Sequence, residues 1–269
     1  AEDSEDLIEE IKRCYAEIAE DKDFVLIEGL GGFTRDGDST LACYRISEAL
    51  NVPVLLILRY SDTLEPDILE KARKELGNRL AGVVINFVPE KKMAKAMNEA
   101  VAKFNDAGIK VLGLISEDRT LAGVSVGELA EKLGAEIITA KNNTEGIVEN
   151  IMLASLPLEP AASYFGRKPN KAVVIRSERY DTQLAALETS TACLILTGNT
   201  EPQSMVTNFA EEKKIPVMLV KKETDEVLVD LEQATGLAAF NNRNKLSRLQ
   251  QLLANWDFKQ FYAAIGRAL

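Results

Sequence analysis

The chain has 269 residues, of which 46% are hydrophobic and 28% are charged, and its formal net charge is −10. These values are typical of a folded globular protein, and the length fits two domains of about 100–200 residues each. The negative charge argues against nucleic acid as a partner, and the absence of histidine excludes Ser-His-Asp and Cys-His catalytic pairs as well as imidazole-bound zinc.

Neither a membrane segment nor a secretory leader is expected from the sequence. No apolar run approaches the ~18–20 residues that a membrane helix needs, and no basic segment followed by an apolar one opens the chain. The three cysteines, Cys14, Cys43 and Cys193, are scattered, which suits a reducing compartment. We therefore expect a cytoplasmic protein that does not bind membranes.

The first half of the chain alternates between helix and strand patterns. Apolar residues at helical spacing predict a helix at about residues 5–20. Apolar runs typical of buried strands lie at residues 24–27, 52–58, 80–86 and 110–115, with helices expected at 40–50, 64–76 and about 90–106. Strands separated by single helices predict a parallel sheet with helices on both faces.

After residue 116 the pattern changes to that of a second, smaller α/β domain. Ser125 and Glu128 form a capping box, which predicts a helix that ends at Leu133. Further strands are expected at residues 136–139, 171–175, 191–196 and 215–220, and helices at 181–188, 204–213 and 223–233. Residues 147–158 are an irregular apolar segment, and 160–165 predict one or two helical turns.

The tail at residues 241–269 has the apolar stripes of amphipathic helices, which favour packing on its own domain or on a second subunit. The chain thus divides into a first α/β domain at residues 1–120, a second at 121–240 and a helical tail at 241–269.

An acidic residue and a glycine-rich turn follow the first apolar run. Glu28 ends that run, and Gly29, Gly31 and Gly32 come after it. Ligands of open parallel sheets lie outside the carboxyl ends of the strands, where an acidic side chain can hold Mg²⁺ and glycines let the backbone approach an anion. A surface loop with glycine turns has the same residues, so both interpretations stay open.

Asn86 ends the third apolar run in the same way. Its amide suits the edge of a purine, but a turn-forming asparagine at a strand end is an equal alternative. Neither G-x-x-x-x-G-K-[ST] nor G-x-G-x-x-G occurs in the chain. The sequence therefore lacks the loop that would supply most of the phosphate-binding energy of such a sheet.

In the second domain, polar residues follow two predicted strands. Arg179 and Asp181 come after the strand at 171–175, and Thr197 and Gly198 come after the strand at 191–196. An arginine fork, an acid at a helix start and a hydroxyl beside a glycine can hold a small anionic ligand. The alternative is that Arg179 and Asp181 form a cluster that caps the helix at 181–188.

Two sets of motifs resemble known families. The segments FVLIEG at 24–29 followed by two glycines, NVPVLLIL at 51–58, GVVIN at 82–86 and VLGLI at 111–115 resemble the dethiobiotin synthetase-like branch of the P-loop fold. The segments SERYDTQLAALE at 177–188 and LILTGN at 194–199 resemble the small domain named for a D-R-T-G-G motif. In this order the two resemble the N-terminal regulatory half of long phosphate acetyltransferases and the phosphotransacetylase family.

The resemblance implies roles for these residues. Glu28 would be the acid on the side of an Mg²⁺ ion, and Asn86 would face the base of an adenine nucleotide. The region around Arg179 and Asp181 would serve ligand sensing or subunit contact. Two departures are that Glu178 stands where the motif has aspartate and that 269 residues leave no room for an acetyltransferase catalytic domain.

We therefore expect a non-catalytic regulatory or ligand-binding protein. It would form a homo-oligomer and respond to a nucleotide or a small anionic metabolite. The alternatives are an ATP- and Mg²⁺-dependent dethiobiotin synthetase-like ligase, if a phosphate loop lies upstream of Ala1, and a scaffolding domain without a ligand.

Overall fold

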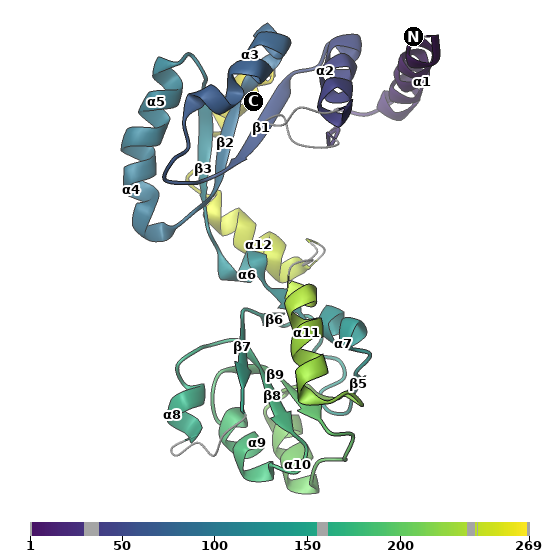
Figure 1. The fold of residues 1–269 in the computed structure, drawn as a ribbon, viewed down its shortest axis with the longest axis vertical. Helices are drawn as coiled ribbons and strands as arrows, with labels where there is room; N and C mark the ends of the chain where they lie inside the picture. Colours follow the sequence, from purple (N-terminus) through teal and green to yellow (C-terminus); the bar gives the residue numbers. More distant parts are fainter. Residues whose placement is uncertain (1, 30–37, 155–160, 236–239, 241, 268–269) are drawn as a thin grey trace. The chain divides into compact units, whose positions relative to one another are not determined.

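The computed structural model describes residues 2–29, 38–154, 161–235, 240 and 242–267 (Figure 1). The chain divides into two compact units, the first made of Ala1–Glu117 with Leu253–Leu269 and the second of Asp118–Leu252. It therefore crosses between the units twice, at residues 117–118 and 252–253. Within the described ranges, no helix combines the length and apolar character that a membrane span requires.

The first unit contains a parallel sheet of three strands in the order β1-β2-β3. The strands are Val54–Arg59 (β1), Leu80–Val88 (β2) and Val111–Ser116 (β3). The helices are Glu2–Ala19 (α1), Asp38–Leu50 (α2), Glu70–Leu76 (α3), Met93–Lys95 (α4), Val101–Asp106 (α5) and Phe258–Ala264 (α13), with a π-helical turn at Ala96–Ala100 between α4 and α5 and 3-10 turns at Pro66–Leu69, Gly77–Arg79 and Glu90–Lys92.

Helix α3 and the α4–α5 stretch cover one face of this sheet. The buried side chains Leu69, Leu76 and Phe104 pack there against Val83 and Ile85 of β2. The opposite face carries Gly113 of β3, which pairs with Val84, and the indole of Trp256 lies directly on it. The C-terminal segment, through Trp256, thus packs on the face of this sheet that lies opposite α3.

The expected first strand at residues 24–27 was wrong. Residues 24–29 have no strand structure, and Leu26 is 85% exposed. Residues 24–27 are as apolar as the other strands, but a strand also needs a neighbouring strand to pair with its N–H and C=O groups. Among the described residues β1 pairs only with β2, so residues 24–27 do not pair with the edge of this sheet. The ring of Phe24 instead lies 5.6 Å from the guanidinium of Arg267.

The second unit is built on a five-stranded sheet in the order β5-β10-β9-β8-β7. Its strands are Glu136–Ile137 (β5), Asn150–Leu153 (β7), Lys171–Arg176 (β8), Thr191–Thr197 (β9) and Val217–Leu219 (β10), and a small antiparallel pair joins Val124–Ser125 (β4) to Ile147–Val148 (β6). Its helices are Arg119–Ala122 (α6), Val126–Leu133 (α7), Ala161–Phe165 (α8), Tyr180–Leu187 (α9), Ser204–Glu212 (α10), Thr224–Thr235 (α11) and Arg243–Leu252 (α12).

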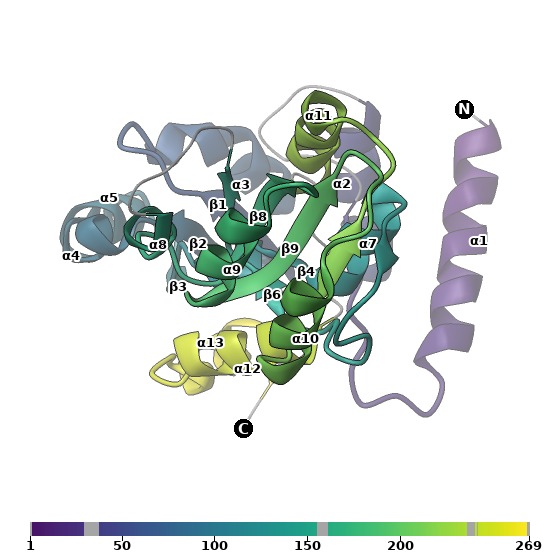
Figure 2. The ribbon, with the colours of Figure 1, turned by 90° about the horizontal axis from the view of Figure 1, so that it is seen from below.

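Helices cover both faces of this sheet (Figure 2). Val174 and Ile195 face α7 and α11, while Val173 and Leu194 face α8, α9 and α10, so neighbouring residues on one strand enter different cores. This alternation is why the strands are apolar throughout. The expected α/β class, with a parallel sheet, a smaller second α/β unit and C-terminal helices, is confirmed.

The predicted capping box at the start of α7 is confirmed. The backbone N–H of Glu128 donates to Ser125 Oγ at 3.2 Å, and the N–H of Ser125 donates to Glu128 Oε2 at 3.0 Å. Gly134 ends the helix in the left-handed conformation, at φ 60°. Both ends of α7 therefore follow from residues that lie within the helix or next to it.

Candidate functional site

The carboxyl ends of β7, β8, β9 and β10 lie at one edge of the second sheet, because these strands are parallel. Four residues at or just beyond these ends form what we call the carboxyl-edge cluster: Arg176, Glu178, Gly198 and Glu223. Arg176 is the last residue of β8, Gly198 follows β9, and Glu223 precedes α11. Ligands of parallel sheets usually bind at this edge.

Arg176 is the centre of the carboxyl-edge cluster. Its Nε lies 3.4 Å from Glu178 Oε2 and its Nη1 lies 3.8 Å from Glu223 Oε2. The three side chains are 52–62% exposed, so each ion pair is a weak surface contact. A hydrogen bond from its own backbone N–H and the nearby Arg176 lower the pKa of Glu178. The ion pairs of the cluster are thus easily rearranged.

Gly198 brings bare backbone up to this cluster. Its φ is +92°, a conformation that favours glycine, and a Cβ there would lie 3.4 Å from Glu178 Oε1 and 3.9 Å from Arg176 Nη2. The absence of a side chain therefore keeps open the space next to the guanidinium.

Buried polar contacts beneath the cluster hold the strand ends in place. Ser177 Oγ donates to Thr197 O at 2.9 Å, and the hydroxyls of Thr197 and Thr224 share a 2.7 Å hydrogen bond. Gln183 Nε2 donates to Arg176 O and Ser177 O, both at 3.0 Å, while its buried Oε1 has no partner. Thr197, one of the predicted binding residues, is fully buried and joins β9 to α11.

The predicted pair Arg179 and Asp181 lies at the start of α9. Arg179 Nη1 donates to Ala154 O at 2.8 Å, just beyond β7. Asp181 is exposed in the first turn of α9, and Thr182 Oγ1 lies 3.4 Å from its Oδ1. The helix begins at Tyr180, and Arg179, at the N-cap position, makes no side-chain capping bond. Arg179 therefore joins the loop before α9 to the end of β7. The carboxylate of Asp181 interacts favourably with the positive, N-terminal end of the α9 dipole.

In the first unit, the predicted residues are not gathered into one cluster by any contact that we observe. Glu28 and Gly29 lie in the exposed stretch outside the sheet, and Gly31 and Gly32 fall outside the described residues. Asn86 is half-buried within β2, two residues before Val88, the last residue of the strand, and its Oδ1 accepts a 2.8 Å hydrogen bond from Phe87 N. Phe87 has a φ of 58° and lies where the pairing of β2 with β3 shifts register between Ile85 and Val88, so this contact belongs to an irregularity within the strand.

The metal-binding role predicted for Glu28 concerns the part of the chain that the structure describes. No group of three or more Cys, Asp or Glu residues there is arranged to hold a metal ion. Proteins often hold Mg²⁺ by one or two carboxylates together with water and phosphate oxygens, so the role of Glu28 stays a prediction.

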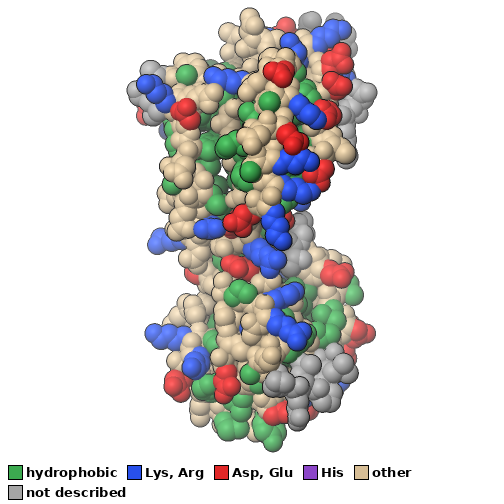
Figure 3. Space-filling model, turned by 90° about the vertical axis from the view of Figure 1, so that its left-hand side faces the viewer, with side chains coloured by type: hydrophobic (Ala, Val, Ile, Leu, Met, Phe, Trp, Pro, Cys, Tyr) green, Lys and Arg blue, Asp and Glu red, His purple; other side chains and the backbone are tan. Residues whose placement is uncertain are grey.

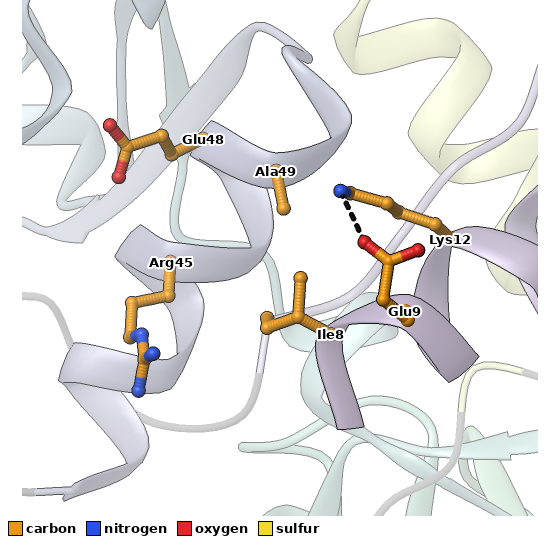
Figure 4. Close-up of a pocket in the computed structure, with 6 residues that line it drawn as sticks. All are labelled: Ile8, Glu9, Lys12, Arg45, Glu48 and Ala49. Atoms are coloured by element: carbon orange, nitrogen blue, oxygen red, sulfur yellow. Dashed lines mark hydrogen bonds and ion pairs between the residues drawn. The ribbon is translucent and has the colours of Figure 1, made fainter. Parts of the chain in front are cut away.

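A hollow of about 380 Å³ lies between α1 and α2 (Figure 4). Its charged side chains do not converge: Lys12 is paired with Glu9 at 2.8 Å, and Arg45 and Glu48 point away from that pair. Ile8 and Ala49 provide its apolar surface. The hollow therefore lacks the set of convergent polar groups that the second sheet offers at its carboxyl edge.

Comparison with known protein families covers most of the chain. Residues 1–125 match the AAA domain family, and residues 128–234 match the DRTGG domain family. The phosphate acetyltransferase of Nitratidesulfovibrio vulgaris is 24% identical over 264 residues, covering 90% of this chain and 37% of that protein. The phosphate acetyltransferase of Pseudomonas aeruginosa is 22% identical over 275 residues, covering 93% of this chain and 39% of that protein.

The chain is a phosphotransacetylase-like protein with a DRTGG domain. It spans 37–39% of the length of these relatives.

A solved structure with lower similarity contains the CBS and DRTGG domains of the regulatory region of Clostridium perfringens pyrophosphatase, in complex with the activator diadenosine tetraphosphate. It is 10% identical, covers 76% of this chain and 87% of that chain, and gives a TM-score of 0.38. This score is too low to establish a common fold, so the activator is a property of that protein alone.

Sequence reasoning missed three members of the carboxyl-edge cluster in this phosphotransacetylase-like chain: Arg176, Glu178 and Glu223. A signal for Arg176 was present, because a charged residue directly ends the apolar run KAVVI at 171–175. No local signal pointed to Glu223. It is 47 residues from Arg176 in the sequence and comes close to it only because β10 and α11 pack beside β8 and β9.

Proposed function

We propose that this chain is a non-catalytic regulatory protein whose DRTGG domain binds an adenine nucleotide at the carboxyl-edge cluster. The observation that supports this most directly is the position of Arg176. Its guanidinium is half exposed, contacts only weakly held carboxylates, and faces a glycine. A phosphate group forms bidentate hydrogen bonds with arginine and would displace Glu178 and Glu223, which would both return to water.

Apolar side chains beside the cluster supply a surface for the base. Tyr180, the first residue of α9, is 43% exposed, and Met205, in the first turn of α10, is 52% exposed. Helices α9 and α10 are in contact. An aromatic ring at this position can stack on a purine, an interaction worth about 1–3 kcal/mol for nucleic-acid bases. The proposal therefore assigns the phosphates to Arg176 and the base to Tyr180.

Isothermal titration of the full chain with ATP, ADP and AMP, with and without Mg²⁺, tests this proposal. We expect binding by wild type and a dissociation constant about tenfold higher for Arg176→Gln, because a hydrogen bond to a charged group contributes about 1.5–3 kcal/mol. Lys168→Gln, an exposed position before the amino end of β8, is the matched control and should bind as wild type does. Absence of heat for every nucleotide, or unchanged binding by Arg176→Gln, would refute the site.

The ligase alternative separates from this proposal in the same samples. A regulatory protein binds ATP without turnover, so phosphate release over hours of incubation with ATP and Mg²⁺ should not exceed that of buffer. Release at a steady rate that depends on protein concentration would favour the ligase instead.

We further propose that the chain works in the cytoplasm as a homo-oligomer. Cys14, Cys43 and Cys193 are free thiols, and burial raises the pKa of Cys193 to about 12, which keeps it unreactive in a reducing compartment. Leu26 and Ile57 of the first unit are 85% and 58% exposed, and apolar side chains in such positions favour a subunit contact. Sedimentation velocity tests this, and a single monomeric species at tens of micromolar would contradict it.

The surface charge does not favour a nucleic acid as the partner. On the face drawn in Figure 3, acidic and basic side chains are intermixed rather than separated by sign. Backbone phosphates of nucleic acids require concentrated positive charge, which a net charge of −10 opposes.

A further inference from the structure

The amino edge of the second sheet contains an open hollow of about 450 Å³. Residues that precede or begin four parallel strands line it: Glu149 for β7, Asn170 for β8, Thr191 for β9 and Ile215 for β10. All its lining residues belong to the second unit. The hollow lies at the edge opposite the carboxyl-edge cluster, where the general rule for parallel sheets predicts no ligand.

The floor of this hollow is apolar and its rim is held by backbone contacts. Ile147 and Ile215 are 8% and 9% exposed, and Ala192 also belongs to the lining. Asn143 Nδ2 donates to Lys214 O at 2.7 Å, and Asn244 Nδ2 donates to Glu145 O at 2.9 Å. These amides are therefore positioned before any ligand arrives, which reduces the entropy lost on binding.

Two lysines of the rim are not neutralised by carboxylates. Across the described ranges, neither Lys213 nor Lys214 has a carboxylate oxygen within 4.0 Å of its Nζ. The Nζ of Lys213 lies 5.3 Å from the ring centroid of Phe209. Glu149, the acidic residue of the lining, already accepts a 2.8 Å hydrogen bond from Thr120 Oγ1. In a chain with a net charge of −10, two adjacent uncompensated ammonium groups over an apolar floor favour an anionic ligand.

The backbone at Lys214 has a conformation that usually favours glycine. Helix α10 ends with Lys214 N donating to Glu211 O at 3.0 Å and Ile215 N donating to Ala210 O at 2.8 Å. Lys214 adopts a φ of 56°, the position at which such helix ends usually have glycine. A lysine in the left-handed conformation is less favourable than glycine, so packing of the helix end does not explain this residue.

We propose that this hollow binds a small organic anion. Its carboxylate or phosphate head would lie on Lys213 and Lys214, and a short apolar body would lie on Ile147, Ala192 and Ile215. The lining includes Thr120, which follows the first crossing between the units, and Asn244 of α12, the helix that leads to the second crossing. This site is independent of the nucleotide site proposed above.

The test measures thermal unfolding of the full chain with butyrate and with butyl phosphate, each at about 10 mM and each against chloride at equal ionic strength. Wild type should show a higher Tm with at least one of the two anions, and their comparison tells whether the head is a carboxylate or a phosphate. No shift with either anion would overturn the proposal.

Lys214→Gly keeps the test independent of misfolding, because glycine suits the backbone at this position. Its Tm without ligand should equal or exceed that of wild type, while its dissociation constant for the active anion rises about tenfold, as does that of Lys213→Gln. Lys168→Gln is the control and should keep the wild-type shift. A full ligand shift in Lys214→Gly, or an equal loss in Lys168→Gln, would contradict the site.

Discussion

Replacing Gly113 by alanine directly tests how the C-terminal segment is held on the first unit. A Cβ built on Gly113 would lie 2.1 Å from Trp256 Cε2, 2.2 Å from Cζ2 and 2.3 Å from Nε1. Ordinary contacts of such atoms begin at 3.4 Å, so the indole must move away by about 1.3 Å. The atoms in conflict belong to a rigid ring, and the ring contacts Phe258 and Phe261, with centroids 5.8 Å and 5.7 Å away, so no single rotation relieves the clash.

The expected loss of stability follows from this displacement. Inserting one methyl group into a packed contact destabilises a protein by about 1–3 kcal/mol, and complete loss of a buried tryptophan contact sets an upper limit of about 3–5 kcal/mol. We therefore expect Gly113→Ala to lower the free energy of unfolding of the first unit by about 2 kcal/mol and its Tm by several degrees.

Trp256 is also the reporter, because it is the single tryptophan of the chain. Its fluorescence should shift to the red in Gly113→Ala as the ring moves toward water, and urea unfolding followed at this tryptophan should show an earlier midpoint. Gly146→Ala is the matched control, since a Cβ there would meet only Val126 Cγ2, at 3.8 Å. Unchanged emission and an unchanged midpoint in Gly113→Ala would refute the packing of Trp256 on β3.

Two further predictions concern the second unit. Lys171 is buried with its Nζ donating to Thr189 Oγ1 and Ser190 O at 2.8 Å, and burial lowers its pKa to about 8 from 10.5. The ammonium of Lys171 keeps its proton to a higher pH in the unfolded chain than in the folded chain. The free energy of unfolding should therefore rise between about pH 8 and 10.5, by at most about 3 kcal/mol. Urea unfolding measured across this pH range should show the rise for wild type but not for Lys171→Met. Ser125→Ala removes the capping hydroxyl of α7 and should lower the free energy of unfolding by about 1 kcal/mol. Ser204→Ala, at an exposed serine, is the control. An equal loss of stability in the control would argue against the cap as the cause.

Much of the candidate site lay within reach of sequence reasoning because its strands carry local signals. The runs at 171–175 and 191–196 are apolar at every position, which predicts strands buried on both faces, and the polar residues after them are the ones that reach the carboxyl edge. The choice among those residues was not predictable. Arg176 and Arg179 are three residues apart, and only the turn between β8 and α9 sends one to the cluster and the other to Ala154 O.

The sequence by itself determined the α/β class, most of the strands in the two sheets and the ends of α7, since periodicity and capping act over a few residues. Only the tertiary structure decided that Phe24–Ile27 stays outside the sheet, that Trp256 returns from the tail to cover Gly113, and that Glu223 meets Arg176. These outcomes depend on which surfaces far apart along the chain become neighbours. A local pattern states that a side chain needs burial or a partner, but it does not specify which distant residue will provide it.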